Sequence, residues 1–350
     1  MSSAPRSRRP TVRDVATEAG VSVASVSRVL ASASKPVSDD TRAKVLAAAQ
    51  KLGYAVNAAA KSLATGRSGM VGVVVPDLGN QYFTTIVQAI VHAARADDFR
   101  VLVGDSLDAA GAETELARET MLRSDGLILC SPRSTDESIL ALLDGEHPVV
   151  TVNRRVDGAA GVSSVSTDVL GATRALVEHL FARGHTALAF VGASALSQQM
   201  QARWQLIQSM VAQAGGRCWQ IPLDTEEPDL GGALGPLVAD GCTGIIAAND
   251  LQAAAVLQSI GHLGIRAPEQ VSVVGFDDTP LARWLHPRLT TAGMHEREVG
   301  RAAWSAMRNL LLDPSDVTHV EFTAEAVFRD SVAAAPSGTG APLSNPSLRG

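Results

Sequence analysis

Apolar residues near the N-terminus follow a helical spacing. Four of them stand at positions i, i+3, i+4 and i+7 and so share one helix face, namely Val12, Val15, Ala16 and Ala19. Gly20 follows, and glycine readily adopts the left-handed conformation that ends a helix. Ser22 can cap a second helix with a buried face made of Ser25, Val26, Val29 and Leu30. The pattern therefore predicts two short helices joined by a turn.

The next segments also favour helices. Ser38 can cap a third helix over residues 39–52, which closes at Gly53. Its expected inward face consists of Val45, Leu46, Ala49 and Leu52. Asn57 can cap a further run over residues 57–64, but two turns are too short to stay helical alone. We expect that run to fold only against another surface.

The first two predicted helices are typical of a helix-turn-helix. The second helix of that motif lies in the major groove of DNA, with its first residues on base edges. Helical hairpins that only pack a core are also common, so the pattern by itself leaves both interpretations open. Val23 and Ala24 can touch thymine methyls, and Arg28 is the candidate to read a guanine, although a phosphate-bound or solvated arginine is the alternative. Side chains that can donate to phosphates are Thr11, Ser22, Ser25, Ser27, Thr41 and Arg42.

From Met70 onward the pattern changes to alternating strands and helices. Strands are expected at 70–75, 99–103, 126–130, 147–152, 187–191, 219–223, 244–248, 271–276, 318–322 and 326–328. Helices are expected at 81–97, 112–122, 136–143, 169–183, 199–214, 230–239, 251–263 and 297–311. Apolar strands between amphipathic helices indicate parallel sheets, and two such series indicate two lobes. The expected fold class is α/β: an all-α helix-turn-helix headpiece plus a two-lobed body of parallel sheets flanked by helices.

Ligands of open α/β sheets bind at the carboxyl ends of the strands, so the cleft between the lobes is the expected pocket. Side chains at those ends include the aromatic pair Tyr82 and Phe83, and the polar residues Asp77, Asn80, Gln81, Asn153, Arg154, Asn249, Asp250, Asp277 and Asp278. Polar residues at strand ends also serve as helix caps, so the sequence leaves two roles for each of them, a helix cap or a ligand contact. Together they favour polyhydroxylated ligands such as sugars or nucleosides.

Residues 11–63 resemble the DNA-binding headpiece of the lactose repressor–galactose repressor family. The resemblance is carried, in fixed order, by Asp14-Val15-Ala16, Ala19-Gly20-Val21-Ser22, Val26-Ser27-Arg28-Val29-Leu30, Val37-Ser38, Thr41-Arg42, Leu52-Gly53-Tyr54, and Asn57-x-x-Ala60-Lys61-Ser62-Leu63. It continues more loosely to about residue 332, which implies a periplasmic-binding-protein-like body. Val23 and Ala24 match the pair that helps to choose the operator, and resemble the galactose-repressor branch.

The resemblance also implies roles for other residues. The segment containing Asn57, Ala60, Lys61 and Leu63 would sit in the minor groove as a paired helix, with Leu63 inserted into the central base step. An ordinary linker helix with Leu63 packed on the body is the alternative. Arg203 matches the family's pocket arginine, and Asn153, Asn249 and Asp277 match other contact positions. Leu206 departs from the family's glycine, which leaves the ligand or the local packing there open.

Charge is divided unevenly along the chain. Residues 1–69 hold eleven Lys or Arg against four Asp or Glu, a net +7, whereas the remainder holds nineteen against thirty-two, a net −13. Attraction of one part to phosphate requires this arrangement. The expected plan is a disordered tail 1–9, a headpiece 10–56, a hinge helix and linker 57–69, a body 70–332 and a disordered tail 333–350. Within the body, lobe 1 takes about 70–165 and 292–322, and lobe 2 about 166–291 and 323–332.

Composition narrows the remaining classes. Cys130, Cys218 and Cys242 are scattered through apolar segments, as buried thiols of a reducing compartment would be. Neither an apolar run of about eighteen residues nor a secretion signal is present, so we expect a soluble, cytoplasmic, nucleoid-associated protein without a membrane partner. The motifs of dinucleotide, phosphate-loop and metal sites are missing, so no cofactor and no metal are expected. The tail also lacks the leucine heptads of a tetramerising coiled coil, which favours a dimer.

Two short motifs of the sequence resemble those of a catalytic site. Gly104-Asp105-Ser106-Leu107 and Asp316-x-x-His319 resemble the nucleophile block and the acid–base pair of a serine-esterase family. The block, however, follows the second strand of its lobe instead of the first, and Asp316 lies in a loop. We therefore expect no enzyme. A solute-binding protein with a vestigial headpiece is another alternative. The preferred hypothesis is a transcriptional regulator, a repressor, that binds a palindromic double-stranded operator as a homodimer under allosteric control by a small carbohydrate effector.

Overall fold

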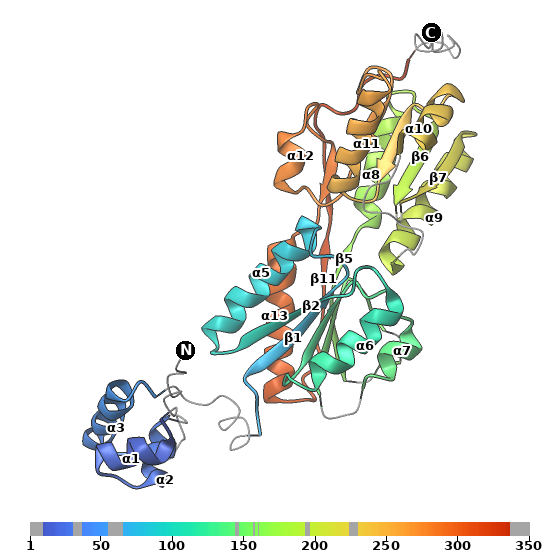
Figure 1. Cartoon of the computed structure of the whole chain (residues 1–350). Coiled ribbons are helices and arrows are strands. Elements are labelled where there is room, and N and C mark those ends of the chain that lie inside the picture. The colour runs from blue at the N-terminus through green and yellow to red at the C-terminus, as the bar shows by residue number, and fades with distance from the viewer. Residues whose placement is uncertain are drawn as a thin grey trace, which may run out of the picture. The chain divides into compact units, whose positions relative to one another are not determined.

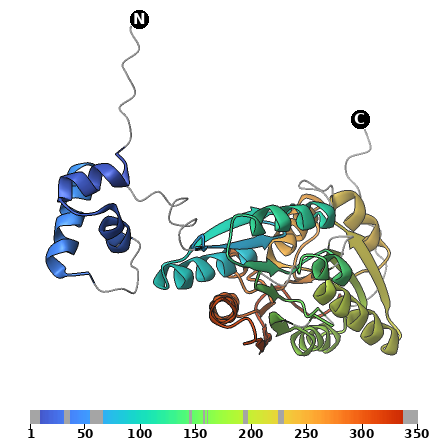
Figure 2. The same ribbon diagram turned by 90° about the horizontal axis from the view of Figure 1, so that it is seen from below.

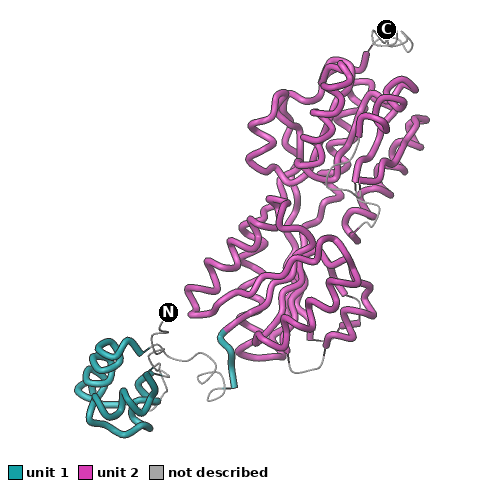
Figure 3. Tube along the Cα trace, in the orientation of Figure 1, with its two compact units in different colours: residues 1–69 teal, residues 70–350 magenta. Residues whose placement is uncertain are grey.

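The computed structural model describes residues 10–30, 37–54, 66–143, 147–156, 158–159, 161–192, 197–223 and 230–336. The chain divides into two compact units, residues 1–69 and residues 70–350 (Figure 3). Three of the expected segments lie outside the described residues: the tail 1–9, the run 57–64 with Asn57, Ala60, Lys61 and Leu63, and the tail from residue 337.

The described residues of the first unit form the helices α1 (Val12–Ala19), α2 (Val23–Leu30) and α3 (Asp39–Lys51). Thr11 and Asp14 form a capping box at the start of α1, and Gly20 ends that helix with a φ of 64°. The core of the unit is made of Val15, Ala16, Val26, Val29, Val45, Ala48 and Ala49. An ion pair of 2.5 Å between Lys51 and Glu18 joins α3 to α1.

The sequence prediction for the inward face of α3 is wrong at Leu46. Its side chain is 51% exposed, whereas Ala48 is buried. Val45, Ala48 and Ala49 occupy positions i, i+3 and i+4, which face the other two helices. Leu46 lies one residue, about 100° of helix, beyond Val45 and therefore outside that stripe.

The first lobe of the body is built on a six-stranded parallel sheet in the order β11-β5-β4-β3-β1-β2. The strands are β1 (Met70–Val75), β2 (Arg100–Asp105), β3 (Leu127–Cys130), β4 (Val149–Val152), β5 (Val162–Asp168) and β11 (His319–Thr323). The helices are α5 (Gln81–Ala96), α6 (Ala110–Met121), α7 (Asp136–Leu140) and α13 (Glu296–Leu312). Helices α5 and α13 cover one face of the sheet and α6 and α7 the other (Figure 1, and Figure 2 from below).

The second lobe holds a four-stranded parallel sheet in the order β7-β6-β8-β9. Its strands are β6 (Ala187–Gly192), β7 (Arg217–Pro222), β8 (Gly244–Ala247) and β9 (Ser272–Val274). Its helices are α8 (Leu170–Phe181), α9 (Gln198–Gln213), α10 (Leu230–Ala239), α11 (Asp250–His262) and α12 (Pro280–Trp284). The α/β fold class, with parallel sheets flanked by helices, is confirmed.

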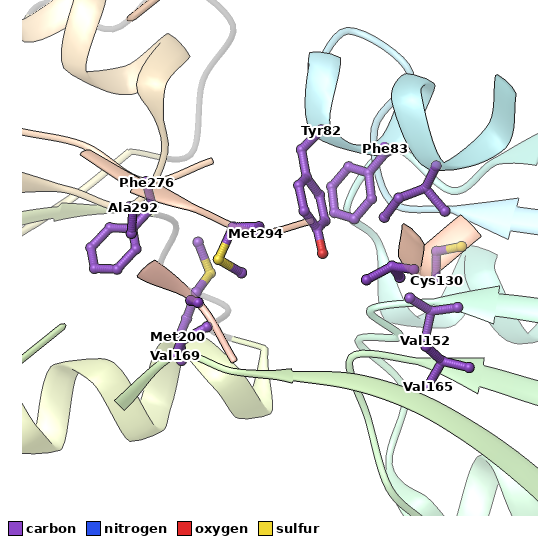
Figure 4. Packing of buried hydrophobic residues seen from close by; sticks show 14 of the residues in the cluster. Tyr82, Phe83, Cys130, Val152, Val165, Val169, Met200, Phe276, Ala292 and Met294 are labelled. Atoms are coloured by element: carbon purple, nitrogen blue, oxygen red, sulfur yellow. The ribbon is translucent and has the colours of Figure 1, made fainter. Parts of the chain in front are cut away.

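The chain passes between the lobes three times. It leaves the first lobe after β5, returns through β10 (Thr291–Gly293), and crosses again through β12 (Glu325–Val327). Strands β10 and β12 pair as a short antiparallel ribbon. One hydrophobic cluster continues through this junction, and Figure 4 shows Met294 lying between Tyr82 of the first lobe and Met200 of the second.

The structure differs from the sequence expectations in four features. Strand β5 and helix α12 were not foreseen, and the strand expected over 271–276 covers only Ser272–Val274. The tail expected to be disordered from residue 333 is held on the second lobe as far as the description extends. The Ala333 carbonyl accepts from His185 at 2.9 Å, and the Ala335 N–H donates to the Arg183 carbonyl at 2.7 Å. These two contacts extend the ordered chain past the expected boundary at residue 332.

Candidate functional site

The helix-turn-helix presents an exposed row at the start of α2. Val23, Ala24, Ser27 and Arg28 are exposed, and 44% of the Val23 residue surface is in solvent. Two small residues followed by an arginine one turn later leave α2 narrow at its N-terminal end. A helix of this shape can enter the major groove and bring Arg28 to a base edge.

Several predicted phosphate donors also hold the helices in place. The Thr11 hydroxyl donates to Asp14 at 2.8 Å, the Ser22 and Ser25 hydroxyls are 2.9 Å apart, and Thr41 lies 2.9 Å from Ser38. These contacts are caps, which leave Ser27 and Arg42 as exposed side chains not used for capping. The prediction of phosphate contacts for all of these residues stays a prediction.

A cleft with a volume of about 510 Å³ lies in the body where the two lobes meet. Its walls include every effector-binding residue proposed from the sequence: Tyr82, Phe83, Asn153, Arg203, Asn249 and Asp277. The residues come from α5, from the ends of β4, β8 and β9, and from α9, so the carboxyl ends of both sheets face the same space. The volume falls within the usual range of small-molecule sites, about 300–1,000 Å³.

Asn153 organises the wall on the first lobe. It has a φ of 57°, and its amide donates to the Tyr82 hydroxyl at 2.6 Å and to Ser131 at 3.0 Å. Gln199 of α9 donates to the Thr167 carbonyl at 2.7 Å and approaches the Asn153 carbonyl oxygen at 3.4 Å, which joins the network to the second lobe. Burial raises the pKa of Tyr82, so this phenol stays protonated.

Arg203 supplies the charge of the opposite wall. Only 6% of the residue is exposed, and its guanidinium lies 4.3 Å from the centre of the Phe276 ring. It donates to the Ala248 carbonyl at 2.9 Å, while its buried Nε has no hydrogen-bond partner. Burial lowers the pKa of Arg203 to about 10, which still leaves it charged at neutral pH.

Two buried carboxyl groups, those of Asp277 and Asp250, lie close enough to interact with one another. Asp277 is buried at the cleft with a φ of 107°, and burial together with nearby Asp250 raises the pKa of Asp277 well above its ordinary value. Asp250 accepts from the Thr279 N–H at 2.7 Å and from the Thr291 hydroxyl at 2.6 Å. Asp250 therefore fastens the crossing strand β10 to the second lobe.

Not every residue expected at the strand ends faces the cleft. Asp250 is fully buried away from it, Asp278 is paired with Arg329 and Arg283, and Arg154 is paired with Asp136. Asn249 lines the cleft but uses its side-chain oxygen to cap α11 through the Gln252 N–H at 2.8 Å. Polar residues that follow the strands therefore include helix caps and ion-paired residues as well as residues that line the cleft.

Sequence reasoning missed part of the lining. Ser131, Arg133, Asp108, Gln199 and Gln252 line the cleft but were not proposed. Ser131 and Arg133 follow strand β3, and this position at the carboxyl end of a strand is the sequence signal that identifies them. Gln199 begins a helix and carries no such signal.

The esterase alternative is not supported by the arrangement of its residues. Ser106 follows β2 and His319 begins β11, and these strands are the two opposite edges of the six-stranded sheet. Five strand spacings of about 4.8 Å separate the edges, so the serine and the histidine cannot meet. His319 instead lies 2.8 Å from the Ser164 hydroxyl, and the Ser106 hydroxyl is buried.

Within the part of the chain that the structure describes, no cluster of three His, Cys, Asp or Glu side chains is placed to hold a metal ion. Over those same described ranges, none of the helices has both the length and the apolar character needed to cross a bilayer.

A helix-turn-helix unit and a two-lobed body with a polar cleft together define the class of transcriptional regulators that carry a small-molecule domain. Residues 11–57 match the model of bacterial regulatory proteins of the lacI family, and residues 177–332 match a periplasmic binding protein-like domain. The HTH-type transcriptional regulator GalS of Salmonella typhimurium is 35% identical over 288 residues, which cover 80% of this chain and 84% of GalS. The chain therefore belongs to the lacI family of bacterial transcriptional regulators.

Solved structures agree with this assignment. A Lac repressor dimer bound to operator and the anti-inducer ONPF is 26% identical, with a TM-score of 0.78 over 93% of this chain and 100% of that one. The complex of the transcriptional regulator CelR with cellobiose is 25% identical, with a TM-score of 0.65 over 92% of this chain and 100% of that one. The resemblance stated from the sequence is confirmed.

Proposed function

We propose that this regulator is a homodimeric repressor that binds a near-palindromic operator through its headpiece and releases it when a small carbohydrate occupies the body cleft. The observation that carries the proposal is the joint presence, in one chain, of an exposed helix-turn-helix on a basic segment and a polar cleft on an acidic body. The relative solved with operator is a dimer, and CelR was solved with cellobiose.

The DNA-binding half of the proposal rests on charge and shape. The segment 1–69 carries a net +7, which suits phosphate contacts, and Arg28 and Arg42 are both exposed on it. In this proposal Arg28 reads a base, Val23 and Ala24 contact thymine methyls, and Arg42 contacts a phosphate. A two-fold dimer would then read two half-sites one helical turn apart. Such a protein acts in the cytoplasm, at the nucleoid.

The effector half rests on the cleft lining. Asn153, Gln199, Arg203 and Asp277 bring amide, guanidinium and carboxyl groups to one space, beside the aromatic faces of Tyr82 and Phe83. Multiple hydroxyl groups on a carbon ring can pair with the first set while the ring packs on the second. This mixture favours a carbohydrate over an apolar ligand.

Repression and effector binding are then linked through the same dimer. If effector lowers operator affinity by some factor, operator must lower effector affinity by that same factor. Binding of effector to isolated protein and to operator-bound protein should therefore differ by the factor measured on DNA.

A selection experiment tests the proposal. Full-length protein is incubated with a pool of palindromic duplexes and excess random competitor at moderate salt, and retained duplexes are sequenced and used in gel shifts with and without sugars. We expect one symmetric sequence to be enriched and at least one carbohydrate to weaken its binding. Equal binding to selected and random duplexes would refute the repressor proposal, and an operator affinity that no carbohydrate changes would refute its effector half.

A further inference from the structure

Arg133 is held rigidly in the cleft wall of the first lobe. Its side chain is 7% exposed and pairs with Asp108 through Nη2 at 2.8 Å and Nε at 2.9 Å. Its Nη1 donates to the Ser131 carbonyl at 2.7 Å. Three fixed contacts on one guanidinium leave little rotamer freedom, so Arg133 is preorganised.

The backbone under Arg133 is fixed as well. Glu113 of α6, only 3% exposed, accepts the Arg133 N–H at 2.8 Å and the Ser134 N–H at 3.0 Å. A buried carboxylate that receives two backbone donors fixes the loop after β3 where the cleft begins. A buried glutamate and a half-exposed aspartate of the first lobe thus hold one arginine in place.

Arg203 approaches the same space from the second lobe. Both guanidiniums line the cleft, and the positive charge of Arg133 is near enough to lower the pKa of Arg203. Among the described residues Arg203 forms no ion pair, and its guanidinium donates one hydrogen bond, to the Ala248 carbonyl. Two like charges with restricted access to water repel one another unless an anion lies between them.

The carboxyl groups of the lining do not supply that anion. Asp108 is already paired with Arg133, and Asp77 accepts the Gly79 N–H at 2.6 Å. Asp277 is the carboxyl group whose charge acts on Arg203, but no hydrogen bond or ion pair joins the two among the described residues, and burial with the neighbouring Asp250 raises the pKa of Asp277 although Arg203 lowers it. The charge on Arg203 therefore has no firm partner in the described protein.

We propose that the effector carries an anionic group, a carboxylate or a phosphate on a polyhydroxylated carbon skeleton, and that this group binds between Arg133 and Arg203. The inference rests on the proposed carbohydrate effector and narrows it to sugar acids and sugar phosphates. Arginine suits both anions because its planar donors can bind two oxygens at once. An anion held from both lobes would also draw the two walls together.

Matched ligand pairs test the inference by calorimetry on the full chain. Each pair differs in the anionic group: gluconate with sorbitol, galacturonate with galactose, and glucose 6-phosphate with glucose. We expect an anionic member to bind about 10- to 100-fold more tightly than its neutral counterpart, the range of one or two charged hydrogen bonds. The carboxylate and phosphate pairs separate the two sources of the anion.

Two variants separate recognition from structure. Arg133→Gln removes the Arg133 charge, leaves Arg203 in place and leaves Asp108 solvated, since the Asp108 side chain is 47% exposed. Arg154→Gln is the matched control: this arginine has a side chain that is only 13% exposed, pairs with Asp136 and donates to the Ser134 carbonyl at 2.6 Å, but does not line the cleft. Arg133→Gln should reduce the preference for the anionic member at least tenfold, and Arg154→Gln should leave it unchanged.

The outcomes of these experiments distinguish an anionic effector from a carbohydrate effector in general. If neutral sugars bind as tightly as their anionic counterparts, the inference is overturned and the carbohydrate effector stands. The same holds if Arg133→Gln weakens both members equally, because Arg133 would then act only on the loop. If neither neutral nor anionic sugars bind, the carbohydrate effector itself is refuted.

Discussion

The side-chain amide of Asn153 donates a hydrogen bond of 2.6 Å to the hydroxyl of Tyr82. The contact joins the end of β4 to the first turn of α5 inside the cleft, and both residues are buried. Since a second amide hydrogen bond goes to Ser131, the two acceptors fix the plane of the Asn153 amide and direct its carbonyl oxygen. The orientation of a ligand-facing group therefore depends on a phenol from another element.

Tyr82→Phe should lower both stability and effector affinity. A buried amide donor loses one acceptor, which should destabilise the body by about 1–2 kcal/mol in urea unfolding. Effector affinity should fall about five- to tenfold because Asn153 loses its orientation. The only other tyrosine, Tyr54 of the headpiece, provides the control: Tyr54→Phe should not change effector affinity. Unchanged affinity in the Tyr82 variant would show that the amide is positioned without the phenol.

Arg28 and Arg42 should differ in what their loss does on DNA. Arg28→Ala should relax base preference at one position of each half-site, by about 1–3 kcal/mol of discrimination. Arg42→Ala should weaken binding to all sequences alike and reduce the salt dependence by about one phosphate contact. Binding-site selection and salt titration measure the two effects. Identical behaviour of the two variants would remove the base-reading role from Arg28.

Asp250 should make stability depend on pH with an unusual sign. Burial raises its pKa to about 7 in the folded protein, whereas an unfolded aspartate has a pKa of about 3.9. Between these values the folded state binds more protons, so the stability from this group falls as pH rises from about 4 to about 7. The slope can reach about 1.4 kcal/mol per pH unit.

The Asp250 prediction is read from a difference between proteins. The free energy of unfolding of wild type minus that of Asp250→Asn should decrease across pH 4–7 and stay level above it. Asp313→Asn gives the opposite sign, because hydrogen bonds from Ser315 lower the pKa of Asp313, so its contribution is lost as pH falls. A flat Asp250 difference would mean that its hydrogen bonds from the Thr279 N–H, the Thr279 hydroxyl and the Thr291 hydroxyl keep the carboxylate ionised at every pH tested.

Two truncations test the role of the chain beyond Val332. Removal of residues 337–350 leaves the contacts of Ala333 and Ala335 intact, and stability should not change. Removal of residues 333–350 deletes the acceptor of the His185 ring and the donors to Ser272 and Arg183. This longer truncation should lower the free energy of unfolding by about 2–4 kcal/mol, measured in urea. Equal stability of the two proteins would contradict a structural role for residues 333–336.

The sequence allowed most of the body to be predicted because its strands are buried on both faces. Continuous apolar runs such as Val71–Val75 and Leu127–Cys130 indicate such strands directly. Strand β5 escaped because its interior holds Ser163, Ser164 and Thr167, which are buried but polar. The Ser163 and Ser164 hydroxyls have partners 155 residues away in the sequence, Thr318 and His319, and no local pattern indicates such partners.

The candidate site was predicted in outline by one geometric rule. The carboxyl ends of parallel strands share an edge, and so Asn153, Asn249 and Asp277 could be placed together before their distances were known. The rule could not separate Asp277 from Asp278, because neighbouring residues point in different directions and only the packed structure shows which one meets the cleft. The prediction that Leu46 of the headpiece faces inward was wrong for a similar reason, since apolar character alone does not fix the angular position of a residue on its helix.

The three crossings between the lobes have a further consequence for this chain. Strand β11 belongs to the first sheet but follows the second lobe in the sequence, and residues 328–336 return to the second lobe. Neither lobe is therefore a continuous stretch of polypeptide. Neither could be synthesised as a simple fragment, and one proteolytic nick in a single crossing would leave the halves tethered by the other two. Any relative motion of the two lobes must also bend all three crossings together.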